Sequence, residues 1–422
     1  PDPARTRGTR RSSGGHQGRR PLEAEVAVKI HTKAVHAGDR KKAPPQTAVT
    51  TPIYAAASFI SDTTEELDRI FAREQEGYCY ARYENPTNAA LEELAASLEN
   101  GHGALACASG MSAVQIALLA ALTDRRKSIV AANALYGATI SLLQKVFEPL
   151  GVETNFVDIC DLAGVEKAIA GRRPGCVLME TISNPLLRVG AMEEIAGLAK
   201  AAGAALVVDN TFATPLLVRP LERGASIVVH SVTKYLAGHG DVLGGIVVAD
   251  RGHHEIARTL SRAYGPVLGP FESYLTMRGI KTFPLRMERQ CANACRVASR
   301  LAAHPRVERV HFPGDPAHPD AAAIRRLFPE GLYGGMVSFE IRDAGREDIF
   351  AFLDRLKLVV RATSLGDVHT MILYPAMSSH REVSPKQRER MGIRDNLVRL
   401  SVGIEDPEDI LADLEQALGA AR

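Results

Sequence analysis

The stretch from Ala205 to Gly240 limits most strongly what this chain can fold into. It contains two short apolar runs, Ala205–Val208 and Ser226–Val229. Continuous apolar runs of this length, bounded by turn residues, are typical of buried strands in a parallel sheet. Asp209 follows the first run, and the segment His230–Lys234 follows the second. In open α/β sheets ligands bind at this carboxyl edge, so we expect the polar side chains to face a ligand.

The polar residues at this edge suit pyridoxal 5′-phosphate (PLP). Lys234 would form a Schiff base, and Asp209 would keep the pyridine nitrogen protonated. The hydroxyls of Ser231 and Thr233 would bind the phosphate. Taken alone, either strand has a simpler interpretation: a buried aspartate or a surface lysine on an ordinary α/β domain. The two strands together favour the cofactor.

The remaining pattern predicts two domains. Between Ala104 and Asp250 a βαβ rhythm recurs, which predicts a mostly parallel, doubly wound sheet. From Leu285 the strands and helices interleave differently, as in a smaller α+β domain. The predicted divisions are a disordered basic tail over 1–25, an arm reaching a neighbouring subunit over 26–85, a large cofactor-binding domain over 86–284 and a C-terminal domain over 285–422.

Charge is concentrated at the N-terminus. Residues Pro1–Arg20 carry six arginines and one aspartate, with almost nothing apolar, which predicts disorder. The segment Lys29–Phe59 is rich in proline and threonine and lacks helical periodicity, so we expect an extended arm. The body is close to neutral, which favours a metabolic enzyme over a nucleic-acid binder.

Several classes of protein are disfavoured. No apolar run is long enough to span a bilayer, and the N-terminus has no apolar signal-peptide core. Scattered cysteines favour reduced thiols and a cytoplasmic location. Cys291 and Cys295 lie one helical turn apart, but no second pair completes a metal site. Without a dinucleotide fingerprint, a nicotinamide oxidoreductase is also disfavoured.

Further candidate residues precede and follow the central stretch. Tyr80 and Arg82 alternate onto one face of an extended segment, and Arg82 suits a phosphate, although a solvated arginine beside a packing tyrosine is equally consistent. Gly110, at a strand-to-helix turn, would let backbone N–H groups face an anion. Tyr136 could stack on a cofactor ring or belong to the core. Arg399 lies in an apolar strand and needs an anionic partner, either a substrate carboxylate or a structural acid.

Seven motifs, in order, resemble the Cys/Met-metabolism family of PLP enzymes, from about His31 to the C-terminus. The family includes cystathionine γ-synthase, cystathionine γ-lyase, methionine γ-lyase and O-acylhomoserine sulfhydrylase. The motifs are Tyr80–Arg82 with Asn85–Thr87, Ala108–Met111, Tyr136–Gly137, Val208–Thr211, His230–Tyr235, Met277–Thr282 and Val398–Gly403.

The resemblance implies a fold and an assembly. The fold is that of type I PLP-dependent transferases, similar to aspartate aminotransferase: a large α/β domain with a mostly parallel, seven-stranded-type sheet and a smaller α+β C-terminal domain. The family is usually a homotetramer, a dimer of dimers, with active sites shared across subunits. The substrate would be an amino acid.

The resemblance also implies roles at matching positions. Lys234 would shuttle the proton, Asp209 would pair with the pyridinium, and Tyr136 would stack on the ring and act as acid/base toward the leaving group. The cofactor phosphate would be bound by Gly110, Met111, Ser231 and Thr233, together with Tyr80 and Arg82 of a neighbouring subunit. The substrate carboxylate would be bound by Arg399, Ser364 and Asn184.

Departures from the family pattern bear on the substrate. Thr363 and Cys79 stand where enzymes that process cystathionine usually carry glutamate, and Ser141 replaces an arginine of the γ-lyases. A pocket without these charges favours an apolar γ-substituent such as a methylthio group. Against this, Ala138 replaces a cysteine typical of methionine γ-lyases. Other departures are His369 and Tyr374, and the segment Asn184–Val189 is synthase-like.

The expected function is that of a PLP-dependent carbon–sulfur enzyme catalysing γ-elimination or γ-replacement. The pattern leans toward a methionine γ-lyase-like activity. Cystathionine γ-lyase, cystathionine γ-synthase and O-acylhomoserine sulfhydrylase are the alternatives, and an aminotransferase is a weaker one. An alternative from another class is a catalytically silent binding protein on the same fold; the presence of Lys234 and Asp209 argues against it.

Overall fold

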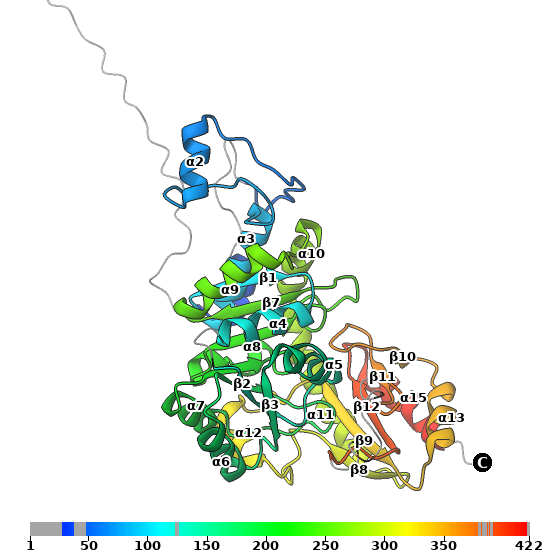
Figure 1. The fold of residues 1–422 in the computed structure, drawn as a ribbon. Coiled ribbons are helices and arrows are strands. Elements are labelled where there is room, and N and C mark those ends of the chain that lie inside the picture. The colour runs from blue at the N-terminus through cyan, green and yellow to red at the C-terminus, as the bar shows by residue number, and fades with distance from the viewer. Residues whose placement is uncertain are drawn as a thin grey trace, which may run out of the picture.

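The structure is a computed structural model that describes residues 28–37, 48–122, 126–378, 381, 386, 388 and 391–419. The predicted disordered tail lies outside the described residues. Two sheets organise the described chain, a large one of seven strands and a smaller one of five (Figure 1). This is the predicted α/β architecture, with a mostly parallel central sheet and a second, smaller sheet domain.

The large sheet has the order β1-β7-β6-β5-β4-β2-β3. Neighbours pair in parallel except β7, which is antiparallel to both β1 and β6. The strands are β1 (Gly103–Cys107), β2 (Ser128–Ala132), β3 (Glu153–Val157), β4 (Cys176–Glu180), β5 (Ala205–Asp209), β6 (Ile227–Ser231) and β7 (Gly245–Ala249). The two apolar runs predicted as strands are therefore β5 and β6, and they are adjacent.

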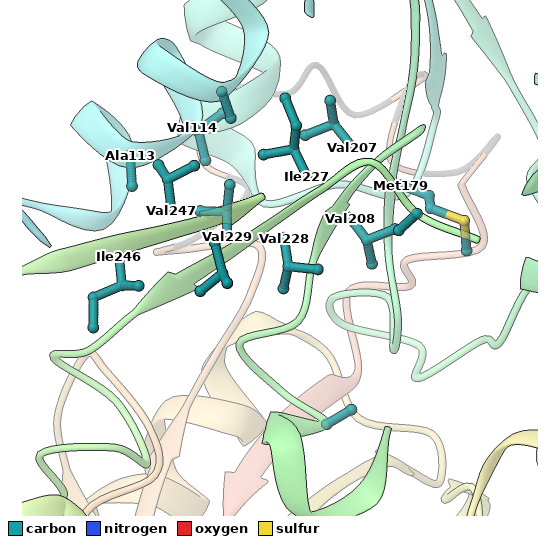
Figure 2. Packing of buried hydrophobic residues seen from close by; sticks show 14 of the residues in the cluster. Ala113, Val114, Met179, Val207, Val208, Ile227, Val228, Val229, Ile246 and Val247 are labelled. Carbon is teal, nitrogen blue, oxygen red and sulfur yellow. The ribbon is translucent and has the colours of Figure 1, made fainter. Parts of the chain in front are cut away.

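Alternating side chains of the large sheet pack on both of its faces, because successive residues of a strand point to opposite sides. Figure 2 shows Val207 and Ile227 on the side covered by helix α4 (Gly110–Ala121), and Val208 and Val228 on the other side. All four side chains are fully buried. Both faces of these strands therefore belong to the core, which is why their sequences are continuously apolar.

Helices and short helical turns precede, connect and follow the strands of the large sheet. They are α3 (Pro86–Glu99), α4, α5 (Gly137–Leu142), the π-helical turn η1 (Leu143–Phe147), the 3₁₀ turn η2 (Glu148–Leu150), α6 (Leu162–Arg172), α7 (Met192–Ala201), α8 (Thr214–Leu217), the 3₁₀ turn η3 (Pro220–Arg223), α9 (Arg251–Tyr264) and α10 (Pro270–Ile280). Helix α4 begins beside β6, which places its N-terminus next to the carboxyl edge of the sheet.

One prediction for the N-terminal region is wrong. Residues Ile30–His36, expected to be extended, form helix α1, which packs against α3. Ile30 and Ala34 are four residues apart and both are buried, so two apolar residues at helical spacing were enough to anchor this short helix. Helix α2 (Thr64–Ala72) buries no residue and stands apart from the body, at the end away from the small sheet (Figure 1).

The small sheet has the order β10-β11-β12-β9-β8 and is mostly antiparallel. Its strands are β8 (Val307–His311), β9 (Met336–Ile341), β10 (Val360–Arg361), β11 (Met371–Leu373) and β12 (Leu397–Ser401). The helices of this region are α11 (Phe283–Ala302), α12 (Ala321–Leu327), α13 (Arg346–Arg355) and α15 (Pro407–Gly419). A separate apolar core forms here around Phe339, Val398 and Leu414.

Helix α11 joins the cores of the two sheets, and helix α12 packs against the large one. Met287 and Cys291 of α11 belong to the core of the large sheet, whereas Ala294 and Val297 of the same helix belong to the core of the small one. Helix α12, although it follows β8 in the chain, buries Ile324 against the large core. The predicted division at residue 285 therefore falls inside a continuous helix.

Arg286 of α11 holds the turn that follows β6. Its guanidinium donates to the carbonyl oxygens of Tyr235 (2.9 Å), Leu236 (3.2 Å) and Gly279 (2.9 Å). Gly238 has a φ of +72°, and a Cβ there would lie 1.9 Å from the guanidinium, so only glycine leaves room for this arginine. Arg286 therefore ties the segment carrying Lys234 to the helices between the two sheets.

We expect Arg286→Ala to lower the free energy of unfolding by about 3 kcal/mol, because it leaves buried carbonyl groups without donors and opens a cavity. Urea denaturation followed by circular dichroism measures this loss. Arg289→Ala is the matched control, since Arg289 lies on the same helix but is exposed. Equal stability of the two variants would contradict the role given to Arg286.

Among the described residues, no helix is both long and apolar enough to cross a membrane. Within the same residues, no three His, Cys, Asp or Glu side chains gather as metal ligands would. All six cysteines are free thiols in the structure, and Cys107, Cys176 and Cys291 are buried.

Candidate functional site

A cavity of about 470 Å³ opens at the carboxyl edge of the large sheet, against the small sheet. Eleven of the thirteen predicted site residues line it. They are Gly110, Met111, Tyr136, Asn184, Asp209, Ser231, Thr233, Lys234, Thr363, Ser364 and Arg399. The structure therefore brings residues from seven different segments of the chain to one place.

Asp209 and Lys234 lie at the base of this cavity, at the ends of adjacent strands. The Asp209 carboxylate accepts a hydrogen bond from the backbone N–H of Thr211 at 3.0 Å. Burial raises the pKa of Asp209, while hydrogen bonds from Thr211 and the charge of His230 oppose this rise. Lys234 Nζ donates to Ser364 Oγ at 2.7 Å. Burial, and then the charge of Arg399, lowers the pKa of Lys234 to about 8, which makes its amine a better nucleophile at neutral pH.

Backbone N–H groups at the N-terminus of α4 face the end of β6. Gly110 and Met111 are the first residues of α4, so their N–H groups have no acceptor within the helix. A Cβ on Gly110 would lie 2.8 Å from Ser231 Cβ, so glycine keeps open the space between the helix and this strand. A helix N-terminus with a serine hydroxyl beside it is a suitable site for a phosphate.

Arg399 of β12 enters the cavity from the small sheet. It donates to Asn184 Oδ1 at 2.8 Å and to the carbonyl oxygen of Ser364 at 3.2 Å. Its Nε is buried and has no acceptor among the described residues. Burial lowers the pKa of Arg399 to about 10, which leaves it charged at neutral pH. An unpaired buried N–H on a charged fork fits a carboxylate ligand.

Ser364 connects the two cationic residues. Its hydroxyl accepts from Lys234 and its carbonyl oxygen accepts from Arg399. Its φ of +96° lies in the left-handed region that non-glycine residues rarely adopt. Backbone strain of this kind is held only where the surrounding structure demands it, and it is concentrated at functional sites.

Together, these groups fit PLP. The structure offers a lysine amine with a lowered pKa, a carboxylate at the end of the next strand and an anion cradle at a helix N-terminus. The unpaired Arg399 Nε adds a place for the carboxylate of an amino acid. These are the donor and acceptor types that the cofactor and its substrate require.

Tyr80 and Arg82 do not line the cavity. The Arg82 guanidinium donates to the carbonyl oxygen of Arg262, and it lies 4.7 Å from the ring centroid of Tyr83. Tyr80 is exposed and stacks edge-on with Tyr83. Within one chain these two residues are thus separated from the other predicted site residues, and their phosphate role stays a prediction.

Other positions singled out in the sequence also lie elsewhere. His369 is exposed and its Nδ1 is 2.8 Å from the Asp367 carboxylate. The hydroxyl of Tyr374 donates to the carbonyl oxygen of Asp395, and its ring is buried in the small core. Cys79 lines a different cavity, beside α2. None of the three lines the cavity that holds Lys234.

The sequence interpretation missed several residues of the site. Glu180, at the end of β4, lines the cavity and is paired in register with Asp209. Burial, and then the charge of Asp209, raises the pKa of Glu180 well above its ordinary value. Thr211 and Phe212 also line the cavity, and the Phe212 ring lies 5.9 Å from the Arg399 guanidinium carbon. Glu180 directly follows the apolar run Cys176–Met179, which marks it as an acid at a strand end but does not show that it neighbours Asp209.

A buried network lies behind the cavity. His230 Nε2 and Glu99 Oε1 are 2.6 Å apart, and Asn210 Nδ2 donates to the same oxygen at 2.9 Å. His230 precedes Ser231, and Asn210 follows Asp209. The last residue of α3 therefore links the ends of β5 and β6 from below, and helps to fix the spacing of the side chains that face the cavity.

The lowered pKa of Lys234 makes the capture of PLP dependent on pH. A lysine with a lowered pKa loses its proton at a lower pH than an exposed lysine does. The rate of PLP capture should therefore rise with pH, with its midpoint at a pH of about 8, and then level off. Stopped-flow absorbance on the apoprotein at a series of pH values measures this. Lys234→Ala should abolish the covalent capture. A midpoint near the ordinary lysine value of 10.5 would contradict the buried environment described above.

Comparisons with known proteins show the family of the chain. A profile of the family described as Cys/Met metabolism PLP-dependent enzymes matches residues 31–419. The L-methionine γ-lyase of Fusobacterium nucleatum subsp. polymorphum is 43% identical over 392 residues, which cover 92% of this chain and 98% of that protein. The cystathionine γ-synthase of Mycobacterium bovis is 43% identical over 389 residues, covering 92% and 96%.

A solved structure shares the whole fold. The cystathionine γ-synthase of Xanthomonas oryzae pv. oryzae, in complex with aminoacrylate and cysteine, is similar with a TM-score of 0.87 and 37% identity. The match covers 93% of this chain and 98% of that one. With the family profile spanning nearly the whole chain, these similarities establish both the fold and the cofactor. The chain belongs to the Cys/Met metabolism family of PLP-dependent enzymes.

Proposed function

We propose that this enzyme catalyses γ-elimination on a sulfur amino acid with an uncharged, apolar γ-substituent, as methionine γ-lyases do. L-Methionine and water would give 2-oxobutyrate, ammonia and methanethiol. The observation that carries the proposal is the charge distribution in the cavity. Among the described residues, the ionised or ionisable acids and bases that line it, apart from Tyr136, are Glu180, Asp209, Lys234 and Arg399.

Each of these four groups already has a neighbour or a task at the base of the cavity. Among the described residues that line the cavity within one chain, no further charge is left to pair with the distal ammonium and carboxylate groups of cystathionine. The rest of the lining is rich in apolar side chains, including Met111, Ile182, Leu243 and Leu373. A methylthio group is stabilised by such surfaces, whereas a zwitterion loses hydration there without compensation.

The residues of the cavity divide the chemistry between them. PLP supplies an electron sink for the negative charge that develops at Cα. Lys234 takes the proton from Cα and delivers protons to neighbouring carbons, and Tyr136 protonates the departing thiolate. Arg399, Asn184 and Ser364 hold the substrate carboxylate.

The remaining residues hold the cofactor. Asp209 holds the pyridine nitrogen in its protonated form, and Gly110, Met111, Ser231 and Thr233 bind the phosphate. Thr363, exposed at the rim of the cavity, faces the distal end of the substrate. In this arrangement Ser231 and Thr233 act from the same turn that carries Lys234.

A cystathionine-processing activity is the second candidate. It is favoured by a relative of equal identity, the cystathionine γ-synthase of M. bovis, and by the synthase-like segment Asn184–Val189. O-Acylhomoserine sulfhydrylase shares this alternative class. Thr363 separates the two candidates, since enzymes acting on cystathionine usually carry a glutamate at the matching position.

Release of 2-oxobutyrate from methionine and from cystathionine, measured separately with the PLP-loaded enzyme, tests the proposal. We expect a higher kcat/KM for methionine. Thr363→Glu should shift the preference toward cystathionine by about tenfold, equivalent to about 1.4 kcal/mol, because it supplies a charge for the distal ammonium. Thr363→Gln, similar in size but uncharged, is the matched control. Faster turnover of cystathionine by the unchanged enzyme would overturn the proposed preference.

We further propose that the active form is a homo-oligomer, a dimer of dimers, located in the cytoplasm. In this assembly Tyr80 and Arg82 reach the phosphate in a neighbouring subunit's cavity. Two observations support a site shared between subunits. Both residues lie away from the cavity of their own chain, and the segment before them exposes apolar side chains, among them Ile60 and Phe71. Exposed apolar groups clustered on one segment are typical of subunit interfaces.

Arg82→Ala should weaken PLP retention by about tenfold, because one charged contact to the phosphate is lost. Equilibrium dialysis measures the retention, and Arg69→Ala, an exposed arginine on α2, is the control. Subunit exchange between Arg82→Ala and Lys234→Ala chains should restore activity at limiting PLP, since mixed pairs contain one complete site. No recovery in the mixture, or a fully active monomer, would show that Arg82 does not act across subunits.

A further inference from the structure

The Glu180 side chain bridges two loops of the cavity. Its Oε1 accepts from the backbone N–H of Tyr136 at 2.6 Å, and its Oε2 accepts from the backbone N–H of Asn184 at 3.1 Å. Tyr136 follows β2 and Asn184 follows β4. One buried carboxylate thus links two loops whose hydrogen-bonded residues, Tyr136 and Asn184, are 48 residues apart in the sequence.

The two bridged residues serve opposite ends of the substrate. Under the proposed function, Tyr136 acts at the leaving group, while Asn184 belongs to the carboxylate site and already accepts from Arg399 at 2.8 Å. The distance between these ends is fixed by the length of the substrate. A link between the two loops therefore sets a dimension that the reaction depends on.

A carboxylate is the side chain that can make this link. Two backbone N–H donors need two acceptor atoms, and glutamine offers only one, its second terminal atom being a donor. Aspartate is one methylene shorter and would reach one loop at most. Retaining a second acid in register with Asp209 is costly, because Glu180 is buried, Asp209 is partly buried, and the charges of the two repel each other.

The charged groups around Glu180 do not offer a simpler role for it. Asp209 approaches from β5 and carries the same charge. Arg399 of β12 donates to Asn184, and its charge acts on Glu180 without forming an ion pair with it. Among the described residues, no lysine, arginine or histidine lies within ion-pair distance of Glu180. Its hydrogen bonds go to the two backbone N–H groups instead.

We propose that Glu180 is a positioning residue, which holds the Tyr136 loop and the Asn184 loop at one separation so that the substrate carboxylate and the leaving group are placed together. This inference rests on the roles of Tyr136 and Asn184 in the proposed function. It assigns a task to the one acid of the cavity that the reaction scheme leaves unused.

A consequence separates this role from general stabilisation. Elimination needs both ends of the substrate in place, whereas exchange of the Cα proton of L-alanine needs only the carboxylate end, because alanine has no leaving group. Loss of the bridge should therefore reduce elimination more than it reduces proton exchange. A merely structural acid would reduce both rates equally, or would change neither rate per bound cofactor.

The test uses the PLP-loaded Glu180→Gln variant. Hydrogen–deuterium exchange with mass spectrometry should show at least about threefold faster exchange in peptides containing Tyr136 or Asn184, because one N–H then faces an amide donor. The kcat for methionine should fall about tenfold, with a smaller rise in KM. Exchange of the alanine Cα proton into deuterated solvent should slow less than about threefold.

Asp413→Asn is the matched control. Asp413 is also a buried carboxylate that accepts from backbone N–H groups of a distant segment, Lys357–Val359, but it does not line the cavity. This variant should loosen peptides near residue 358 and leave kcat and KM unchanged. If Glu180→Gln does not fold, Glu180→Asp is measured in the same way, because its shorter side chain also breaks one of the two contacts.

Two results would overturn the proposal. One is unchanged exchange in both loop peptides of the Glu180 variant. The other is an equal loss of elimination and of alanine proton exchange. Failure of the proposed function would look different, because the unchanged enzyme would then not turn over methionine. The hydrogen–deuterium exchange of the loop peptides and the alanine proton exchange would still test the bridge. Elimination would then be measured on the substrate that the enzyme does use.

Discussion

The site depends on four ionisable side chains that are buried or partly buried around one cavity. Glu180 and Asp209 end adjacent parallel strands, Lys234 lies one turn beyond the next strand, and Arg399 enters from the second sheet. Burial disfavours the charged form of each, raising the pKa of the acids and lowering that of the bases. Only a rigid framework keeps such groups in place, and the seven-stranded sheet with its two-sided core provides it.

Much of the fold could be predicted because strands that are buried on both faces have continuously apolar sequences. The runs around Val207 and Val228 are continuously apolar, and both proved to be central strands. Helix α1 was missed because only Ile30 and Ala34 anchor it, which is too short a pattern to detect. The sharing of α11 between two cores could not be predicted either, since a helical period shows a buried face but not which core it meets.

The site was predictable where one segment carries several functional groups, as the turn from Ser231 to Lys234 does. It was not predictable where function depends on which strands are neighbours. Glu180 faces Asp209 only because β4 pairs with β5 in register, and strand order is not written in either strand. The positions of His369 and Cys79 outside the cavity likewise depend on how the segments that carry them fold back.

The unpaired Nε of Arg399 joins recognition to stability. A buried donor without an acceptor destabilises the protein by about 1–3 kcal/mol. A ligand that brings a carboxylate accepts a hydrogen bond from this Nε and removes the cost as it binds. Part of its binding free energy is therefore the stability that the free protein lacks. By thermodynamic linkage, the melting temperature must then rise with the concentration of any amino acid that the cavity accepts. The folding equilibrium of the protein therefore shifts with the concentration of the amino acids that it binds.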